Sequence, residues 1–411
     1  MIWNGYNFDS FRDYLQKKAT PIFFSRASIA FDVNGNAVNA NVPRYNNGIM
    51  VEESTTNLLT ANQSNGCEDG TTTGFSGSTG TTLSSSTDWY AGGNASLKAV
   101  CDGTASNQGY NLSTRPLAVS GLIYAGQVKI YGLTGDVTVY LNFYDSSSNQ
   151  LSANSQNITL NGTTQTGVVT GTAPANAASV SLMVRTNGAQ SVTFYVDMLQ
   201  IEQKSYPTSW TLGGTTRSGE FYKAYSAQNL INASKGTFEV TVNIPPYWKG
   251  GNNYAVFWEF LNTGGTDKLY LGSASGTNNL FVVINDSAGG TKTLTSENNV
   301  LTPGEHVISV TWNNTGNIGS IYLDGIPLTC TLNGSGTGIA STLNQIVIGS
   351  SNTFNTRVIN ANMSLISISN VERTDLNISD RTNAICPEVD SNIICIAPLV
   401  NSMNMYHIGG S

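Results

Sequence analysis

The segment VTVYLNFY at residues 137–144 shows the pattern that decides the fold. Apolar side chains alternate along it with polar or tyrosine side chains, which predicts a β-strand with one face in a core and the other facing outward. Residues 191–202, SVTFYVDMLQIE, repeat the alternation, and residues 122–131 and 179–186 show it as well. These four segments predict strands of antiparallel β-sheets.

Strand-like segments separated by turns rich in Gly, Asn, Asp and Ser continue along most of the chain. Many short strands with such turns are typical of β-sandwiches and jelly rolls. Residues 8–18 differ, because the spacing of their apolar residues predicts a short amphipathic helix. We therefore predict an all-β protein, with a short N-terminal helix and β unit followed by two antiparallel β-sandwich (jelly-roll) domains. The predicted domains are residues 1–59, 60–212 and 213–380, followed by a C-terminal arm at 381–411.

The chain is acidic but weakly charged. Its 411 residues include 19 Lys and Arg against 26 Asp and Glu. Charged residues make up 11% of the sequence, against a usual share of about 25%. A hydrophobic share of 39% still excludes wholesale disorder. The low charge and the pI of 4.9 argue against binding to nucleic acid.

The first residues lack the basic head and apolar stretch of a secretory signal, so we expect no secretory signal in this sequence. The longest nearly apolar run, residues 393–400, is too short to cross a bilayer, so we predict no membrane span. Five cysteines, at positions 67, 101, 330, 386 and 395, form no CxxC pair, which argues against a thiolate zinc site. Two disulfide pairings stay open, Cys67 with Cys101 and Cys386 with Cys395.

Tyrosine recurs on the polar side of three of these four strands. If these strands share one sheet, its outer face collects Tyr131, Tyr140, Asn142, Tyr144 and Tyr195, with Lys129, Arg185 and Asp197. This face is a candidate glycan-binding site, because aromatic rings stack on the C–H patches of sugars while polar groups pair with their hydroxyls. Trp89 and Tyr90, on a predicted loop, are further candidates. The alternative is packing or a subunit interface, since tyrosine favours any half-exposed sheet.

Candidate catalytic groups are scarce in the sequence. The two histidines, His306 and His407, lie in no recognisable nucleophile motif. Glycoside hydrolysis needs two carboxyl groups flanking the bond, and the strand around Glu259 carries no second acid. We therefore predict that the chain is not an enzyme. Acids brought together from distant strands or adjacent subunits are the remaining alternative.

Four motifs follow one another in residues 26–59: Arg-Ala-Ser at 26–28, an Asp-x-x-Gly turn at 32–35, Asn-Val-Pro-Arg at 41–44, and a closing segment at 49–59 that ends in Thr-Asn-Leu-Leu. Their combination resembles the head-spike or head-fibre domain of tailed-phage structural proteins. The resemblance implies a homotrimeric protein on the virion surface that binds capsid or other virion proteins through this segment. The candidate attachment residues are Trp3, Tyr6, Phe8, Phe11, Tyr14, Arg26 and Arg44.

A second resemblance covers residues 60–212. It rests on Asn57-Leu58-Leu59 with Glu68 downstream, on the strand at 195–202, and on Tyr-Pro-Thr-Ser-Trp at 206–210. These features resemble the carbohydrate-binding-module jelly rolls appended to xylanases and to many phage fibres. The resemblance implies that Glu68 and Asp197 hold a structural calcium, and no other cofactor is expected. The sequence departs from the family next to Glu68, because Cys67 stands where that family has Phe.

A third resemblance covers residues 213–380. Gly-Thr-Phe at 236–238, Ile-Tyr-Leu-Asp-Gly at 321–325 and Ile-Val-Ile-Gly at 346–349 follow in the order seen in laminin-G-like or concanavalin-like jelly rolls. Together the resemblances imply a phage head fibre, spike or capsid decoration protein that adheres to host or environmental glycans. The alternatives are a tail fibre or receptor-binding protein, a purely shell-stabilising decoration protein, and, less favoured, a glycan depolymerase.

Overall fold

The structure is a computed structural model of the chain. It describes residues 20–373, apart from 33, 46–47, 226, 228–230, 247, 249–253, 275, 288, 314–317, 337 and 353–356, and the strand backbones at 393–398 and 404–407. The predicted helix at 8–18 lies outside the described residues. So do the Cys386–Cys395 pairing and five predicted attachment residues: Trp3, Tyr6, Phe8, Phe11 and Tyr14.

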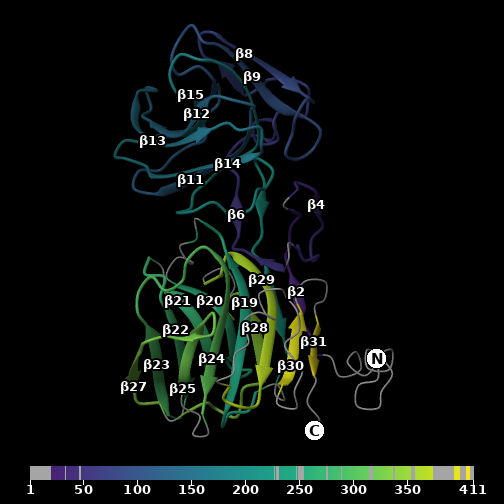
Figure 1. The fold of residues 1–411 in the computed structure, drawn as a ribbon, viewed down its shortest axis with the longest axis vertical. Helices are drawn as coiled ribbons and strands as arrows, with labels where there is room; N and C mark the ends of the chain where they lie inside the picture. The colour runs from purple at the N-terminus through teal and green to yellow at the C-terminus, as the bar shows by residue number, and fades with distance from the viewer. Residues whose placement is uncertain are drawn as a thin grey trace, which may run out of the picture. The chain divides into compact units, whose positions relative to one another are not determined.

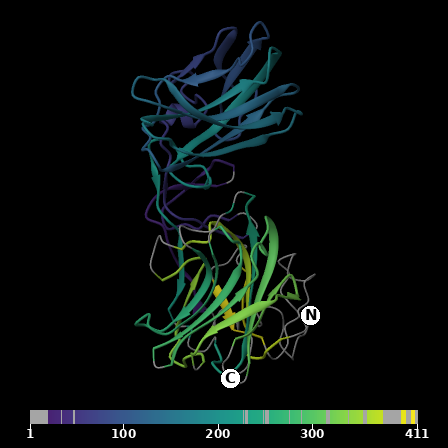
Figure 2. The ribbon, with the colours of Figure 1, turned by 90° about the vertical axis from the view of Figure 1, so that its left-hand side faces the viewer.

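The predicted all-β class is confirmed (Figure 1, Figure 2). The described residues contain one helix, α2 (Ala61–Ser64). Thr60 caps this helix: its side chain accepts a hydrogen bond from the backbone N–H of Gln63, and the Gln63 side chain accepts one from the N–H of Thr60. No helix in the described part of the chain is long and apolar enough to span a membrane.

The chain divides into two compact units. Unit 1 comprises Met1–Ala27, Ala40–Glu53 and Gly219–Ser411, and unit 2 comprises Ser28–Asn39 and Ser54–Ser218. The chain therefore passes from one unit to the other four times.

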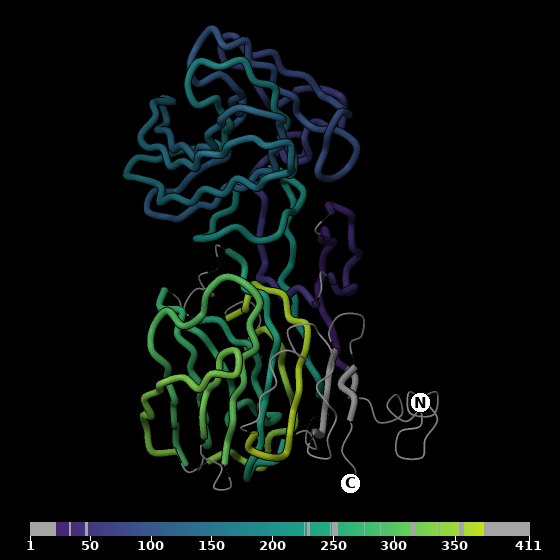
Figure 3. Tube along the Cα trace, in the orientation of Figure 1, coloured from purple at the N-terminus to yellow at the C-terminus, as the bar shows by residue number. Residues whose placement is uncertain are grey.

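The segment predicted as a separate domain at 1–59 does not form a unit of its own among the described residues (Figure 3). β2 (Phe23–Ser25) and β5 (Ile49–Val51) join sheets of unit 1. The hairpin of β3 (Ala30–Phe31) and β4 (Ala37–Val38) belongs to unit 2. So short a segment buries too little apolar surface to fold alone, and its strands are stabilised by joining larger bodies.

Unit 2 is a sandwich of a five-stranded and a three-stranded antiparallel sheet. The five-stranded sheet has the order β14 (Gln165–Thr172), β11 (Ile123–Tyr131), β16 (Ser191–Glu202), β9 (Ser96–Asp102), β8 (Thr81–Ser86). The three-stranded sheet has the order β13 (Gln150–Thr159), β12 (Asp136–Tyr144), β15 (Ser179–Thr186). Two short pairs complete the unit: β7 (Phe75–Gly77) with β10 (Tyr110–Leu112), and β6 (Thr55–Thr56) with β17 (Thr216–Arg217).

The predicted alternation places the core of unit 2. Leu141 and Phe143 of β12 are fully buried, as are Phe194 and Val196 of β16, and all four belong to one apolar cluster between the two sheets. Burial of the apolar face is the main stabilising force for such a sandwich. The alternate residues of the same strands therefore face away from the core.

The four predicted strands are present, but they do not share one sheet. β11 and β16 lie in the five-stranded sheet, whereas β12 and β15 lie in the three-stranded sheet. Their outward residues consequently form two groups on opposite faces of the sandwich, rather than the single face expected from the sequence. Alternation marks which face of a strand is buried, but it carries no information on which neighbour the strand pairs with.

Unit 1 contains two larger antiparallel sheets. One has the order β2, β18 (Phe221–Ala224), β28 (Gln345–Ile348), β20 (Tyr254–Leu261), β21 (Lys268–Ala274), β22 (Leu280–Asp286), β23 (Gly290–Ser296), β27 (Cys330–Gly334). The other has the order β1 (Thr20–Pro21), β31 (Asn404–His407), β30 (Ile393–Pro398), β29 (Ala361–Ser369), β19 (Gly236–Ile244), β24 (Gly304–Trp312), β25 (Ile318–Leu323), β26 (Ile326–Pro327), with β5 also paired to β29. The predicted C-terminal arm thus contributes two strands to this sheet.

Candidate functional site

The outward face of the three-stranded sheet holds one group of the predicted binding residues. Tyr140, Asn142 and Tyr144 alternate along β12, and Asn142 lies directly opposite Ser181 of β15. They border a hollow of about 280 Å³, which we call the β12 hollow. Its lining residues are Asn107, Tyr140, Asn142, Tyr144, Gln150, Ala153, Met183 and Arg185.

The floor of the β12 hollow is polar and buried. Asn142 is 4% exposed, and its amide nitrogen donates to Gln150 Oε1 at 3.0 Å and to the Tyr144 hydroxyl at 3.4 Å. Its Oδ1 atom is buried without a hydrogen-bond partner among the described residues, and so is Ser181 Oγ. A buried polar atom left without a partner costs about 1–3 kcal/mol, so such atoms mark places where water or a ligand binds.

Arg185 forms one wall of the β12 hollow. Its guanidinium donates to the carbonyl of Asn107 at 2.7 Å and to Oδ1 of Asn111. Its Nε atom is buried and has no partner among the described residues. Burial lowers the pKa of Arg185, yet a guanidinium stays protonated at neutral pH. The wall therefore presents a fixed cation with a free N–H.

Local turns position these walls. Gly109 has φ +153°, and a Cβ atom there would lie 2.1 Å from the carbonyl of Val184, so only glycine lets the preceding loop approach β15. Asp145 accepts hydrogen bonds from the N–H groups of Ser147 and Asn149, which closes the β12–β13 hairpin. That hairpin sets Gln150 opposite Tyr144.

The other predicted aromatic residues gather on the outward face of the five-stranded sheet. Trp89 stacks on Tyr131, with ring centroids 5.5 Å apart and an interplanar angle of 11°. Tyr195, directly opposite Tyr131 in register, lies 6.1 Å from it. Tyr90 stands 47% exposed on the same loop as Trp89. The predicted aromatic residues thus face outward from unit 2 in two groups, not in the single group expected from the sequence.

The two predicted calcium ligands bind the same loop. Glu68 Oε1 accepts the N–H groups of Asn94 and Ala95 at 2.6 and 2.8 Å. Asp197 Oδ2 accepts those of Ala91 and Gly92 at 2.8 and 2.9 Å. Burial, with a contribution from the charge of Glu68, raises the pKa of Asp197 to about 6. Within the described residues, no group of three or more His, Cys, Asp or Glu side chains is placed to hold a metal ion.

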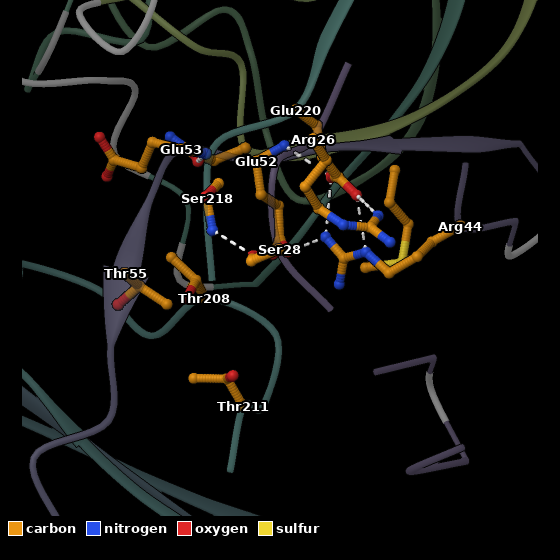
Figure 4. Close-up of polar contacts among 12 residues, drawn as sticks. Arg26, Ser28, Arg44, Glu52, Glu53, Thr55, Thr208, Thr211, Ser218 and Glu220 are labelled. Carbon is orange, nitrogen blue, oxygen red and sulfur yellow. Dashed lines mark hydrogen bonds and ion pairs between the residues drawn. The ribbon is translucent and has the colours of Figure 1, made fainter. Parts of the chain in front are cut away.

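The predicted attachment residues Arg26 and Arg44 lie inside unit 1, at 0% and 1% exposure, and so are not available to a virion partner. Figure 4 shows the Glu220 carboxylate facing both guanidinium groups. Arg44 donates to both oxygens of Glu220 at 2.8 and 2.7 Å, and to Glu52 at 2.7 Å. Burial would lower the pKa of Arg44, but the charges of Glu220 and Glu52 outweigh it and raise the pKa. The four residues form a structural ion cluster.

Cys67 and Cys101 are buried free thiols, so the disulfide left open by the sequence is not formed. Burial raises the pKa of Cys67 to about 12, which leaves its thiol protonated and unreactive at neutral pH.

The residues weighed as catalytic candidates have structural partners. Glu259 is 2% exposed, pairs with Lys268 at 3.1 Å and accepts the N–H of Asn352 at 2.6 Å. His306 lies between Asp324 Oδ2, at 2.8 Å from Nδ1, and the carbonyl of Thr302, at 2.9 Å from Nε2. The Thr302 hydroxyl also lies 3.2 Å from Nε2, so the ring bridges the segments that carry Thr302 and Asp324. The side chain of His407 lies outside the described residues.

No protein-family model matches the sequence, and no curated protein matches it. Among solved structures, the CBM22-1 xylan-binding domain of Paenibacillus barcinonensis Xyn10C is 15% identical, with a TM-score of 0.31, covering 37% of this chain and 98% of that one. The CBM22-1–CBM22-2 tandem of the same protein is 12% identical, with a TM-score of 0.32, covering 73% and 98%.

A heptameric SAP-like pentraxin from Limulus polyphemus is 11% identical, with a TM-score of 0.31, covering 43% of this chain and 81% of that one. Likenesses at this level carry no argument about function. None of these comparisons supports the resemblance to phage head-spike proteins.

Proposed function

We propose that unit 2 binds carbohydrate in the β12 hollow. The observation that carries the proposal is that two residues lining the hollow each keep a buried polar atom with no partner among the described residues: Asn142 Oδ1 and Arg185 Nε. The ring of Tyr140 lines the same hollow.

Sugar chemistry suits this combination. A pyranose ring stacks its C–H face on an aromatic ring such as that of Tyr140. Its hydroxyls both donate and accept, so one hydroxyl donates to Asn142 Oδ1 while another accepts from Arg185 Nε. Binding then removes the cost of two unpaired polar atoms, which is how a shallow polar hollow gains specificity.

The proposal is tested by glycan binding of the full chain. The probes are soluble hexasaccharides of xylose, glucose, mannose and N-acetylglucosamine, together with mucin O-glycans. Tyr140→Ala and Arg185→Ala should each weaken binding at the β12 hollow at least tenfold, whereas Tyr225→Ala, at an exposed tyrosine of unit 1, should not. Equal binding by all four proteins would assign the tyrosines to packing or to a subunit interface.

We further propose that the chain is a phage virion protein, a homotrimeric head fibre, spike or decoration subunit that displays this site on the virion surface. Support comes from the motifs at 26–59 alone. Closed rotational symmetry would let weak single sites act together. Imaging labelled chains on whole particles tests the proposal. Label on the tail would favour the receptor-binding alternative, and its absence from particles would exclude a virion role.

A structural calcium between Glu68 and Asp197 is also proposed. Calcium favours carboxylate and carbonyl oxygens, and the two carboxylates approach one loop closely enough for Glu68 to raise the pKa of Asp197. Glu68 Oε1 and Asp197 Oδ2 each already accept two backbone N–H groups, and Asp197 Oδ1 accepts one. Glu68 Oε2 and the second lone pair of Asp197 Oδ1 are the donors left for a calcium ion, which would neutralise two like charges.

Calcium should raise the melting temperature of the wild-type chain relative to EDTA, because a ligand that binds the folded state stabilises it. At a hundredfold excess over the dissociation constant the gain is about 2.7 kcal/mol. Asp197→Asn should abolish the response. Identical melting curves for the wild type in calcium and in EDTA would rule out the site.

A further inference from the structure

A second hollow, of about 420 Å³, lies on the other face of the unit 2 sandwich. We call it the β16 hollow; it is lined by Asp88, Tyr131, Leu133, Thr134, Ser191, Val192, Thr193 and Tyr195. Tyr131 and Tyr195 are out of phase with Ile130, Phe194 and the other core residues of the five-stranded sheet. The core of the unit therefore separates this hollow from the β12 hollow.

The aromatic wall of the β16 hollow is braced. Trp89 covers Tyr131 face to face, and its indole N–H donates to Thr164 Oγ1 at 3.3 Å. Tyr195 donates its hydroxyl hydrogen to Asp88 at 3.1 Å, and the Lys98 ammonium lies 5.4 Å from the centre of its ring. Rings held in this way lose little conformational entropy when a ligand stacks on them.

The polar groups of the β16 hollow suit hydroxyls. Asp88 has an exposed side chain (58%) that also pairs with Lys98 at 2.7 Å. The hydrogen bond from Lys98 keeps the pKa of Asp88 below its usual value, so the carboxylate is an acceptor at neutral pH. Ser191, Thr193 and Thr134 add hydroxyls that both donate and accept.

Two other ligand classes fit less well. A cation such as a quaternary ammonium needs space between rings, and here ring centroids 5.5–6.3 Å apart are already in contact. The Asp88 charge is, moreover, already paired with Lys98. A purely apolar ligand would cover the hydroxyls of Ser191, Thr193 and Thr134 without forming hydrogen bonds with them.

We propose that the β16 hollow is a second carbohydrate-binding site, which makes unit 2 divalent. The ligand class, carbohydrate, is taken from the proposed function. The residues that form this second site are different from those of the β12 hollow. Because the sites lie on opposite faces of one sandwich, a single oligosaccharide does not occupy both. One molecule of the protein can therefore bridge two glycan chains, which raises avidity on a dense glycan surface.

The test is a calorimetric and fluorescence titration of the full chain with the same hexasaccharides and mucin O-glycans. Thr193→Arg blocks the β16 hollow from its exposed rim while leaving the ring contacts in place, and Tyr131→Ala removes its wall. Tyr140→Ala with Arg185→Ala disables the β12 hollow. Tyr225→Ala, at an exposed tyrosine of unit 1, is the matched control, and Trp89→Phe identifies the indole signal that belongs to the β16 hollow.

We expect two sites per chain in the wild type, one in each single-hollow variant, and a fluorescence change on binding that is lost in Trp89→Phe. Retained binding in the Tyr140→Ala/Arg185→Ala variant, weakened at least tenfold by adding Thr193→Arg, supports the second site. Loss of all binding in the Tyr140→Ala/Arg185→Ala variant overturns the second site and leaves the first. Binding that responds only to the β16 variants overturns the first, and no binding to any probe overturns both.

Discussion

At the scale of single residues, Asn142 shows a conflict between stability and binding. It faces outward from β12 yet is 4% exposed, and its Oδ1 has no partner among the described residues. A side chain chosen for folding alone would be apolar there, since unpaired buried acceptors are costly. The amide of Asn142 supplies the hydrogen-bond acceptor that a ligand hydroxyl would need.

Asn142→Leu should leave the free energy of unfolding within about 1 kcal/mol of the wild type, since the lost hydrogen bonds are offset by removal of the unpaired oxygen. Glycan binding should fall at least tenfold. Urea unfolding and calorimetry measure the two effects. Strong destabilisation with unchanged binding would make Asn142 a structural residue only.

Glu202 makes stability depend on pH. Its fully buried carboxylate accepts hydrogen bonds from Thr208 and Gln200, but burial outweighs them and raises its pKa. The folded chain therefore keeps this proton to a higher pH than the unfolded chain, whose glutamates titrate near about 4.3. The contribution of Glu202 to stability is present below that pH and is lost as pH rises through the folded pKa.

Glu202→Gln should flatten the curve of unfolding free energy against pH above about pH 4, where a single group contributes at most about 1.4 kcal/mol per pH unit. Glu297→Gln, at an exposed position, should keep the wild-type slope. Parallel curves for the wild type and Glu202→Gln would show that Glu202 does not titrate in this range.

At the scale of elements, the sequence predicted the strands but not their partners. β12 and β16 were predicted to within a residue, because apolar residues alternate along both. β13 was not recognised, since QLSANSQNIT carries few apolar residues and is largely exposed. The pairings that divide the tyrosines between two hollows depend on contacts between segments distant in the sequence.

The residues of the candidate site could also be predicted only in part. Alternation identifies neighbours on one strand but not contacts between segments that are distant in the sequence. Tyr140, Asn142 and Tyr144 lie on one strand, so alternation alone puts them on one face. Asn107 comes from a loop that only Gly109 lets approach β15, and no periodic pattern marks it. Likewise, Arg44 was predicted as an attachment residue from the resemblance of the motif at 41–44, and its pairing with Glu220, 176 positions away, has no signal in the sequence.

Glu220 holds the segments around β2 and β5 in unit 1. Glu220→Gln removes the carboxylate charge that pairs with both buried guanidinium groups, so we expect a loss of about 3 kcal/mol in unfolding free energy. Urea unfolding measures the loss, with Glu297→Gln as the exposed control. A change as small as the control's would mean that the cluster contributes no net stability.

At the scale of the whole molecule, the protein carries little charge and contains a β-sandwich with two polar hollows. These features suit reversible binding of an uncharged polar ligand. Only 11% of residues are charged, so long-range attraction of charged partners is weak and short-range stacking and hydrogen bonds decide recognition. Each site alone is small, and useful affinity for a glycan surface then comes from several sites acting together.

The central claim is that the β12 hollow binds a sugar through its unpaired polar atoms. A crystal structure of the chain with the hexasaccharide or mucin glycan that it binds most tightly tests this directly. We expect a sugar ring on Tyr140, with hydroxyl oxygens at hydrogen-bond distance, about 2.7–3.2 Å, from Asn142 Oδ1 and Arg185 Nε. A sugar bound elsewhere while both atoms contact only water would contradict the account.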